Sequence, residues 1–145
     1  MGLFAIGERE EDLTHNIEGQ PFVHIEATNS TPEIILNKEQ GTFLFKGRSL
    51  PENPRVFYQP VKNWITDYME KPADFTHIKF DTHYFNTASS KVFLDIISMF
   101  REMEIQGQKL SLEWHYQEDD EDTLEAGEDM AEILEMKFQF IPYVD

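Results

Sequence analysis

Short runs in the first third of the chain alternate apolar and polar residues, which is the pattern of strands with one buried face. These runs occupy residues 22–27, 33–37 and 42–46. Turn-forming residues separate them at positions 29–32 and 40–41. Because the connections are so short, we expect three strands joined as antiparallel hairpins.

A helical spacing replaces this alternation after a turn at residues 50–54 that contains two prolines. Its large apolar side chains share one face of the expected helix, and we interpret them as core: Phe57, Val61, Trp64, Ile65 and Tyr68. Pro60 lies within the pattern, and a proline inside a helix removes a hydrogen bond and clashes with the preceding turn. The helix is therefore expected either to hold Pro60 in its first turn or to bend there.

Strand-like and helix-like patterns alternate in the second half of the chain. A strand is expected at residues 75–80, a helix at about 88–103 and a second strand at 110–116. A last helix, with acidic residues in its first turn, is expected to be interrupted at Gly127. Residues 138–141 then predict a closing strand.

This order of elements predicts one α/β domain, in which helices pack against a mixed β-sheet of about five to six strands. A chain of 145 residues is the right length for a single domain. We place that domain at residues 21–145. Residues 1–20 are acidic and weakly patterned, and we treat them as an extension that is mobile or becomes ordered on contact.

The net charge of the chain limits the classes of partner that it is expected to bind. With 28 acidic and 12 basic residues, the formal net charge is -16. Such a surface repels phosphate backbones and anionic lipids, so we expect neither nucleic acid nor a membrane as a partner. The charge serves either solubility or steering toward a protein with a basic face.

The cellular compartment is indicated by what the sequence lacks. There is no cysteine, which fits a reducing interior and excludes disulfides, thiolate metal sites and thiol nucleophiles. Residues 1–6 are too short an apolar segment for a signal peptide and have no basic flank. No apolar run reaches membrane-spanning length. We therefore expect a cytoplasmic protein.

No catalytic or metal-binding motif stands out in the sequence. The five histidines form no HExxH motif, and the acidic run at 118–122 lacks the alternating ligands and central glycine of an EF-hand. Ser89 beside His83 is the one arrangement that could serve a small hydrolase, but no third catalytic group accompanies it. We expect a protein that is not an enzyme and that holds no metal or cofactor.

A cluster of hydroxyl residues joins the expected central strand to the helix that follows it, at residues 84–91. Thr87 lies near the expected helix N-terminus, where threonine and serine are favoured because their side-chain oxygen accepts an unpaired backbone N–H. From this chemistry alone, Thr87 is either an ordinary helix cap or a site at which a phosphate switches the protein.

Four motifs in a fixed order resemble the SiaC family of bacterial regulatory phosphoproteins, over a stretch from about residue 21 to the C-terminus. The motifs are Ala27-Thr28-x-x-Thr31-Pro32-Glu33-Ile34, Gly47-Arg48-Ser49-x-Pro51-Glu52-Asn53, Tyr84-Phe85-Asn86-Thr87-x-Ser89-Ser90-Lys91, and Trp114-x-Tyr116 followed by Asp120-Glu121-Asp122 and Gly127-Glu128-Asp129. The first twenty residues fall outside the resemblance.

The resemblance implies a single α/β domain similar to the anti-sigma-factor antagonist (STAS-like) domains, with no catalytic activity of its own. A dedicated protein kinase would phosphorylate it and a PP2C-type phosphatase would reverse the reaction. The unphosphorylated form would bind and regulate a partner, a diguanylate cyclase in the best-known system, which places the protein in c-di-GMP signalling and biofilm control. The phosphoacceptor implied here is Thr87.

The sequence departs from the family pattern beside the acceptor. Thr82 and His83 stand where an apolar and an acidic residue usually precede the Tyr-Phe pair, and Ala88 stands where a further serine is common. We expect Tyr84 and Phe85 to pack rather than contact partners.

The expected phosphate switch implies two sets of site residues, the alternative phosphoacceptors and the residues that contact a partner. Ser89 and Ser90 are the alternative phosphoacceptors. The residues expected to contact partners are Asn86, Ser89, Ser90, Lys91, Arg48 and Glu52. The competing interpretation is a constitutive adaptor that binds its partner whether or not it carries phosphate.

Overall fold

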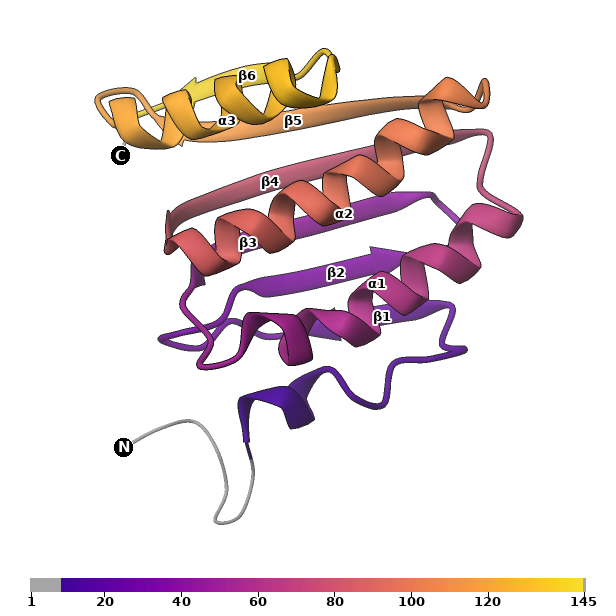
Figure 1. Ribbon diagram of the computed structural model, residues 1–145. Coiled ribbons are helices and arrows are strands. Elements are labelled where there is room, and N and C mark those ends of the chain that lie inside the picture. The colour runs from indigo at the N-terminus through magenta and orange to yellow at the C-terminus, as the bar shows by residue number, and fades with distance from the viewer. Residues whose placement is uncertain (1–8, 145) are drawn as a thin grey trace.

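Six strands form one mixed sheet, and three α-helices cover one face of it (Figure 1). The computed structural model describes residues 9–144, so the expectations for residues 1–8 lie outside the described residues. The strands are β1 (Phe22–Ile25), β2 (Glu33–Asn37), β3 (Thr42–Ser49), β4 (Phe75–Phe85), β5 (Lys109–Gln117) and β6 (Gln139–Tyr143). The helices are the 3-10 helix η1 (Glu10–Leu13), α1 (Pro54–Glu70), α2 (Thr87–Ile105) and α3 (Glu121–Leu134).

The strands lie side by side in the order in which they occur along the chain. The first three are joined as antiparallel hairpins. From β3 to β6 all neighbours are parallel, and α1, α2 and α3 make the crossover connections. The predicted fold class is confirmed, with six strands in the sheet.

Aromatic side chains fill the space between the sheet and the helices. Phe45, Phe80 and Trp114 come from three adjacent parallel strands and are all buried. Their rings stack in a row, with centroids 4.7 Å apart from Phe45 to Phe80 and 5.8 Å apart from Phe80 to Trp114. Because alternate residues of a strand face opposite ways, the period-two pattern of the sequence selected this buried face correctly.

The first long helix resolves the question that Pro60 raised. Helix α1 begins at Pro54, and the Asn53 side chain caps it by accepting a hydrogen bond from Val56 N at 3.3 Å. Proline suits the first helical position because the N–H that it lacks would be unpaired there anyway. Pro60 therefore lies in the helix interior and not in its first turn.

The expected interruption at Gly127 is wrong, because α3 runs through this residue without a break. The glycine has another role. A Cβ atom at position 127 would lie 2.5 Å from Trp114 Nε1, closer than real Cβ contacts come. Gly127 therefore allows α3 to approach the tryptophan of β5 closely.

Thr82 is an exception to the good pairing of buried polar groups. It lies on the helix-covered face of β4 at 1% exposure, and its Oγ1 is the buried side-chain polar atom that has no hydrogen-bond partner within residues 9–144. A buried hydroxyl without a partner loses its hydration and gains nothing in exchange. The unpaired hydroxyl of Thr82 therefore lowers the stability of the fold.

Replacing Thr82 by valine should stabilise the protein by about 1 kcal/mol, because the change removes an unpaired buried hydroxyl and keeps the branched shape of the side chain. Urea denaturation of the wild type and Thr82→Val measures the difference. Thr76→Val is the matched control: Thr76 is equally buried on the same strand, but its Oγ1 lies 2.8 Å from Tyr68 Oη. That control should lose stability, and loss in both variants would contradict the assignment.

Candidate functional site

The carboxyl ends of the parallel strands β3, β4 and β5 meet at one end of the sheet. We call this end the carboxyl edge; it comprises these strand ends, the loop of residues 50–53 and the first turn of α2. In open α/β sheets, binding sites lie just outside this end of the strands. It also brings together two of the motifs that the sequence singled out, Gly47–Asn53 and Tyr84–Lys91.

The first turn of α2 presents Thr87 to solvent. Asn86 is the N-cap, and its Oδ1 accepts a hydrogen bond from Ser89 N at 2.9 Å. Thr87 is the first helical residue and is exposed, whereas the sequence left open whether it is itself the cap. Because Asn86 supplies the cap, the hydroxyl of Thr87 is not needed for that purpose.

Two residues after Thr87, Ser89 belongs to a buried network of hydroxyl groups. Ser49 Oγ lies 2.6 Å from Tyr58 Oη and donates a hydrogen bond to Ser89 Oγ at 2.9 Å. Ser89 has no exposed surface. Burial raises the pKa of the Tyr58 phenol, an effect that the hydrogen bond with Ser49 only partly offsets, so the phenol stays protonated. The network joins α1, β3 and α2 beneath the carboxyl edge.

This geometry changes the interpretation of Ser89. A fully buried side chain offers a kinase or a partner no surface, so Ser89 supports the first turn of α2 from below. The hydrolase alternative also loses its nucleophile, because Ser89 is fully buried and hydrogen-bonded to Ser49. Ser90 is half-buried and stays the nearest alternative acceptor, while Asn86 and Lys91 are exposed as expected.

Of the two aromatic residues that precede the Asn86 N-cap, Phe85 packs against the core as expected and Tyr84 does not. The Phe85 ring packs against Phe93 and Trp114, with centroids 5.4 and 6.1 Å away. Tyr84 is 55% exposed, so the expectation that it packs in the interior is wrong. The guanidinium carbon of Arg48, which is also exposed, lies 5.1 Å from the centre of the Tyr84 ring.

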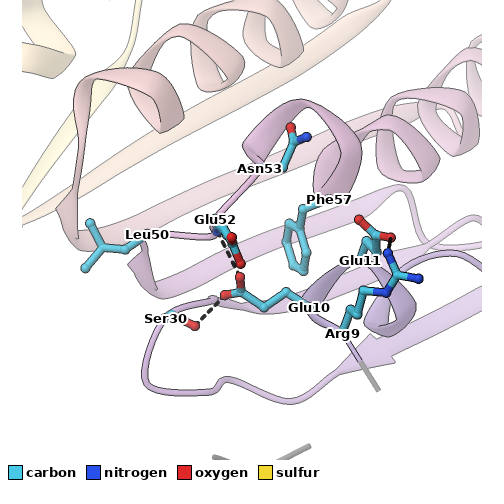
Figure 2. Close-up of a pocket in the computed structure, with 8 residues that line it drawn as sticks. All are labelled: Arg9, Glu10, Glu11, Ser30, Leu50, Glu52, Asn53 and Phe57. Carbon is cyan, nitrogen blue, oxygen red and sulfur yellow. Dashed lines mark hydrogen bonds and ion pairs between the residues drawn. The ribbon is translucent and has the colours of Figure 1, made fainter. Parts of the chain in front are cut away.

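The loop after β3 is held in place by residues 9–20, which were expected from the sequence to belong to an N-terminal extension. We call residues 9–20 the N-terminal strap. The Glu10 carboxylate accepts hydrogen bonds from Ser30 Oγ at 2.6 Å and from Glu52 N at 2.8 Å, and it thus lies between the two (Figure 2). A groove of about 800 Å³ opens here between the strap and the loop of residues 50–53. Glu52, expected to contact partners, is exposed at its margin.

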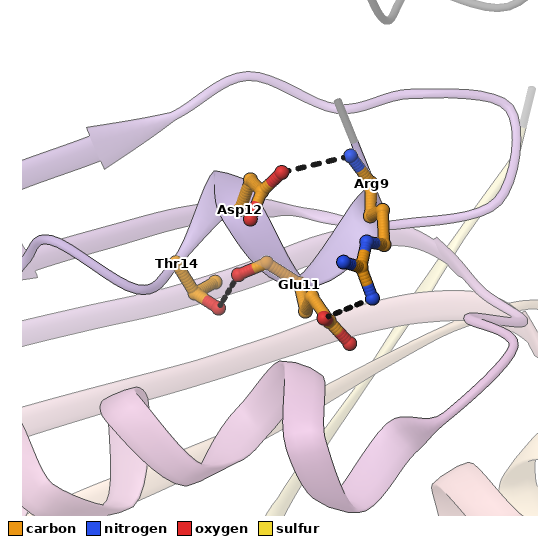
Figure 3. Close-up of polar contacts among 4 residues, drawn as sticks. All are labelled: Arg9, Glu11, Asp12 and Thr14. Carbon is orange, nitrogen blue, oxygen red and sulfur yellow. Dashed lines mark hydrogen bonds and ion pairs between the residues drawn. The ribbon is translucent and has the colours of Figure 1, made fainter. Parts of the chain in front are cut away.

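Local contacts give the strap its shape and fix it to α1. Arg9 Nη1 pairs with Glu11 at 3.3 Å, and Arg9 N donates to Asp12 Oδ2 at 2.9 Å (Figure 3). The buried Thr14 donates to Phe57 O of α1 at 2.6 Å. Apolar Leu13 and Ile17, four residues apart, are the sequence signal that could have predicted this ordered packing.

The acidic segment after β5 begins a helix, as we interpreted it. Asp120 caps α3, with Oδ1 accepting from Thr123 N at 3.0 Å and Oδ2 accepting from Thr123 Oγ1 at 2.7 Å. Within residues 9–144, no three histidine or acidic side chains are placed to hold a metal ion. In the same part of the chain, no helix has the length and apolar character needed to cross a bilayer.

Comparison with known proteins places this geometry in a family. Residues 25–143 match the profile of the SiaC family regulatory phosphoproteins. The chain belongs to the SiaC family. Over 116 residues it is 29% identical to an uncharacterized protein of Pseudomonas aeruginosa strain UCBPP-PA14, covering 80% of this chain and 92% of that protein.

Solved structures of SiaC family members share the fold. One is the crystal structure of the diguanylate cyclase SiaD in complex with its activator SiaC from Pseudomonas aeruginosa, with a TM-score of 0.75, 28% identity, and coverage of 85% of this chain and 99% of that one. Another, SiaC of the same organism, gives a TM-score of 0.74 at 27% identity over 86% and 98% of the two chains. The resemblance inferred from the four motifs is therefore confirmed.

Membership in the SiaC family has two consequences for the site. The family is one of regulatory phosphoproteins, which confirms the expectation of a regulator rather than an enzyme. The matched region begins at residue 25, so the N-terminal strap lies outside it. The strap therefore contacts the carboxyl edge from outside the part of the chain that matches the family profile.

Proposed function

We propose that this chain is a cytoplasmic signalling protein that is reversibly phosphorylated on Thr87, and that its unphosphorylated form binds and regulates a diguanylate cyclase. A protein kinase would add the phosphate and a PP2C-type phosphatase would remove it. The observation that carries the proposal is the exposure of Thr87 at the first position of α2. The related SiaC protein that is solved as an activator of a diguanylate cyclase supports the choice of partner.

Thr87 is the hydroxyl best placed to accept phosphate. It is exposed, whereas Ser90 is half-buried and Ser89 is fully buried. A phosphate at a helix N-terminus meets unpaired backbone N–H groups and the positive end of the helix dipole, which stabilises it by about 0.3–2 kcal/mol. The fold should therefore tolerate the modification.

The size of this stabilisation indicates how a phosphate would switch the protein. Driving a two-state rearrangement nearly to completion takes about 5.5 kcal/mol, more than a helix terminus supplies to a phosphate. Burying an unpaired dianion in an interface opposes binding by several kcal/mol without any change of fold. The proposed switch is therefore steric and electrostatic exclusion of the partner from an otherwise unchanged carboxyl edge.

The acceptor assignment is tested by incubating the purified full chain with its cognate kinase and ATP, followed by intact mass and peptide mapping. The wild type and Ser90→Ala should each gain one phosphate, and Thr87→Ala should gain none, because only the first two retain the exposed hydroxyl of α2. Ser90→Ala is the matched control, since it removes a neighbouring hydroxyl of the same turn. Phosphorylation of Thr87→Ala at the wild-type rate would refute the assignment.

A further inference from the structure

The end of β4 breaks the alternation of the rest of the strand. Gly47 pairs with Thr82, but the next residue, Arg48, pairs with Tyr84, so the register shifts by one residue of β4. Thr82 and Phe85 both lie in the interior as a result, and Tyr84 is exposed. Bulges of this kind re-aim side chains and occur preferentially beside functional sites.

The re-aimed tyrosine contacts an arginine of the neighbouring strand. The Arg48 guanidinium carbon lies 5.1 Å from the Tyr84 ring centre, in the range of a cation–π contact. Within residues 9–144 the guanidinium forms no hydrogen bond or ion pair, so its N–H groups are available at the surface. The contact restricts the side chain of each residue before any partner arrives.

We propose that Tyr84 and Arg48 form the anchor of the surface by which this chain binds its regulated partner, the diguanylate cyclase of the proposed function, on which this inference rests. Tyrosine and arginine are the residue types that most often dominate binding energy at interfaces. The pair is continuous with the carboxyl edge, because Tyr84 lies just before the Asn86 cap and Thr87.

The chemistry of the pair specifies what the partner offers. The exposed ring needs an apolar depression that removes it from water. The unpaired guanidinium needs an acceptor, and a carboxylate matches its planar fork with two parallel hydrogen bonds. The partner surface therefore combines an apolar hollow with an adjacent aspartate or glutamate. Such a local acidic contact is specific because the chain as a whole, at a net charge of -16, repels acidic surfaces.

Other exposed apolar side chains lack this combination. Phe22 is 53% exposed, close to the value for Tyr84, but it begins β1 and therefore lies at the opposite end of the sheet, since β1 runs parallel to β3. Ile133 is exposed in the last turn of α3, which begins at the carboxyl edge and ends far from it. Neither residue contacts an arginine within the described part of the chain.

The test measures the affinity of the unphosphorylated full chain for its diguanylate cyclase by titration calorimetry. Tyr84→Ala should weaken binding by about 30-fold or more, and Arg48→Ala by about 10-fold. Arg48→Lys should lose most of the arginine effect, because lysine keeps the charge but not the planar fork. The double variant should lose less than the product of the two single effects, since the residues act together.

Phe22→Ala is the matched control, an aromatic residue of equal exposure at the far end of the sheet, and it should leave the affinity within about twofold. Circular dichroism and thermal melting establish that each variant is folded. If the wild type binds and Tyr84→Ala binds equally well, this inference is wrong while the proposed function stands. If the wild type does not bind the cyclase at all, the proposed function itself fails.

A second copy of this chain is the competing occupant of the surface. Analytical ultracentrifugation of the wild type over a range of concentrations should show no association that depends on Tyr84. Self-association that Tyr84→Ala abolishes would overturn the inference and assign the pair to a homodimer interface.

Discussion

Phosphorylation of Thr87 is expected to weaken the binding of this chain to its diguanylate cyclase by at least about 100-fold, which corresponds to roughly 3 kcal/mol. The hydroxyl is exposed at the first position of α2, so the added phosphate projects from the carboxyl edge without displacing any helix contact. It brings a charge of about -1.5 to -2 to a surface that a partner must cover. Covering a dianion is unfavourable where the partner offers no cation to pair with it.

The measurement compares three samples of the same chain by calorimetry: unphosphorylated, phosphorylated to completion by intact mass, and phosphorylated then treated with the phosphatase. The third sample should regain the affinity of the first. Thr87→Ala incubated with kinase serves as the control and should bind like the unphosphorylated chain. Thr87→Asp should reproduce only part of the loss, since a carboxylate has less charge and fewer acceptor oxygens than a phosphate. Equal affinity of the first two samples would instead favour a constitutive adaptor.

Replacing Gly127 by alanine is expected to destabilise the fold by about 3 kcal/mol, although alanine favours a helix over glycine by about 1 kcal/mol. The added Cβ would lie 2.5, 2.6 and 2.7 Å from three ring atoms of Trp114. That ring has little freedom to move, because its Nε1 donates to Thr123 O at 2.9 Å and it stacks on Phe80 and Phe138. Overpacking should therefore outweigh the gain in helix propensity.

Equilibrium urea denaturation measures this change in unfolding free energy. Glu128→Ala, at the neighbouring exposed position of α3, is the control for propensity alone and should alter stability by less than about 0.5 kcal/mol. A smaller ring should relieve the clash, so Gly127→Ala should be less harmful in a Trp114→Phe background. Stabilisation by Gly127→Ala in the wild-type background would contradict the role assigned to the glycine.

The sequence predicted those parts of the fold that depend on local periodicity. Alternation predicted the strand at residues 42–46, in which Phe43 and Phe45 are buried, and the stripe along α1 from Phe57 to Tyr68 identified the buried helix face. Both patterns arise because a strand or a helix must bury one side. For the same reason a mixed sheet of about five to six strands could be predicted from the sequence, whereas the order of the strands within the sheet comes from the structure.

The structural features that the sequence did not predict depend on contacts between residues that are distant in the chain. Ser89 is buried because Ser49, forty positions earlier, donates a hydrogen bond to it. Tyr84 is exposed because the pairing of β4 with β3 shifts register, which no pattern within β4 alone can reveal. Gly127 marks a close approach to Trp114, whereas a glycine in a sequence equally indicates the end of a helix. Local helix-cap chemistry singled out Thr87, the family resemblance favoured a phosphoacceptor over a simple cap, and that role stays a prediction.

The N-terminal strap is attached to the rest of the domain through both side-chain and main-chain atoms. Ser30 Oγ donates to Glu10, and Leu13 and Ile17 pack against the core. Glu10 accepts a hydrogen bond from the backbone N–H of Glu52, and Thr14 donates to the backbone carbonyl of Phe57. Main-chain atoms are present whatever side chains a domain carries, so the hydrogen bonds to Glu52 N and Phe57 O would persist through side-chain substitutions there that keep the backbone in place. The bond from Ser30 Oγ would not, which makes Ser30 the position at which a single substitution should loosen the strap without altering the sheet.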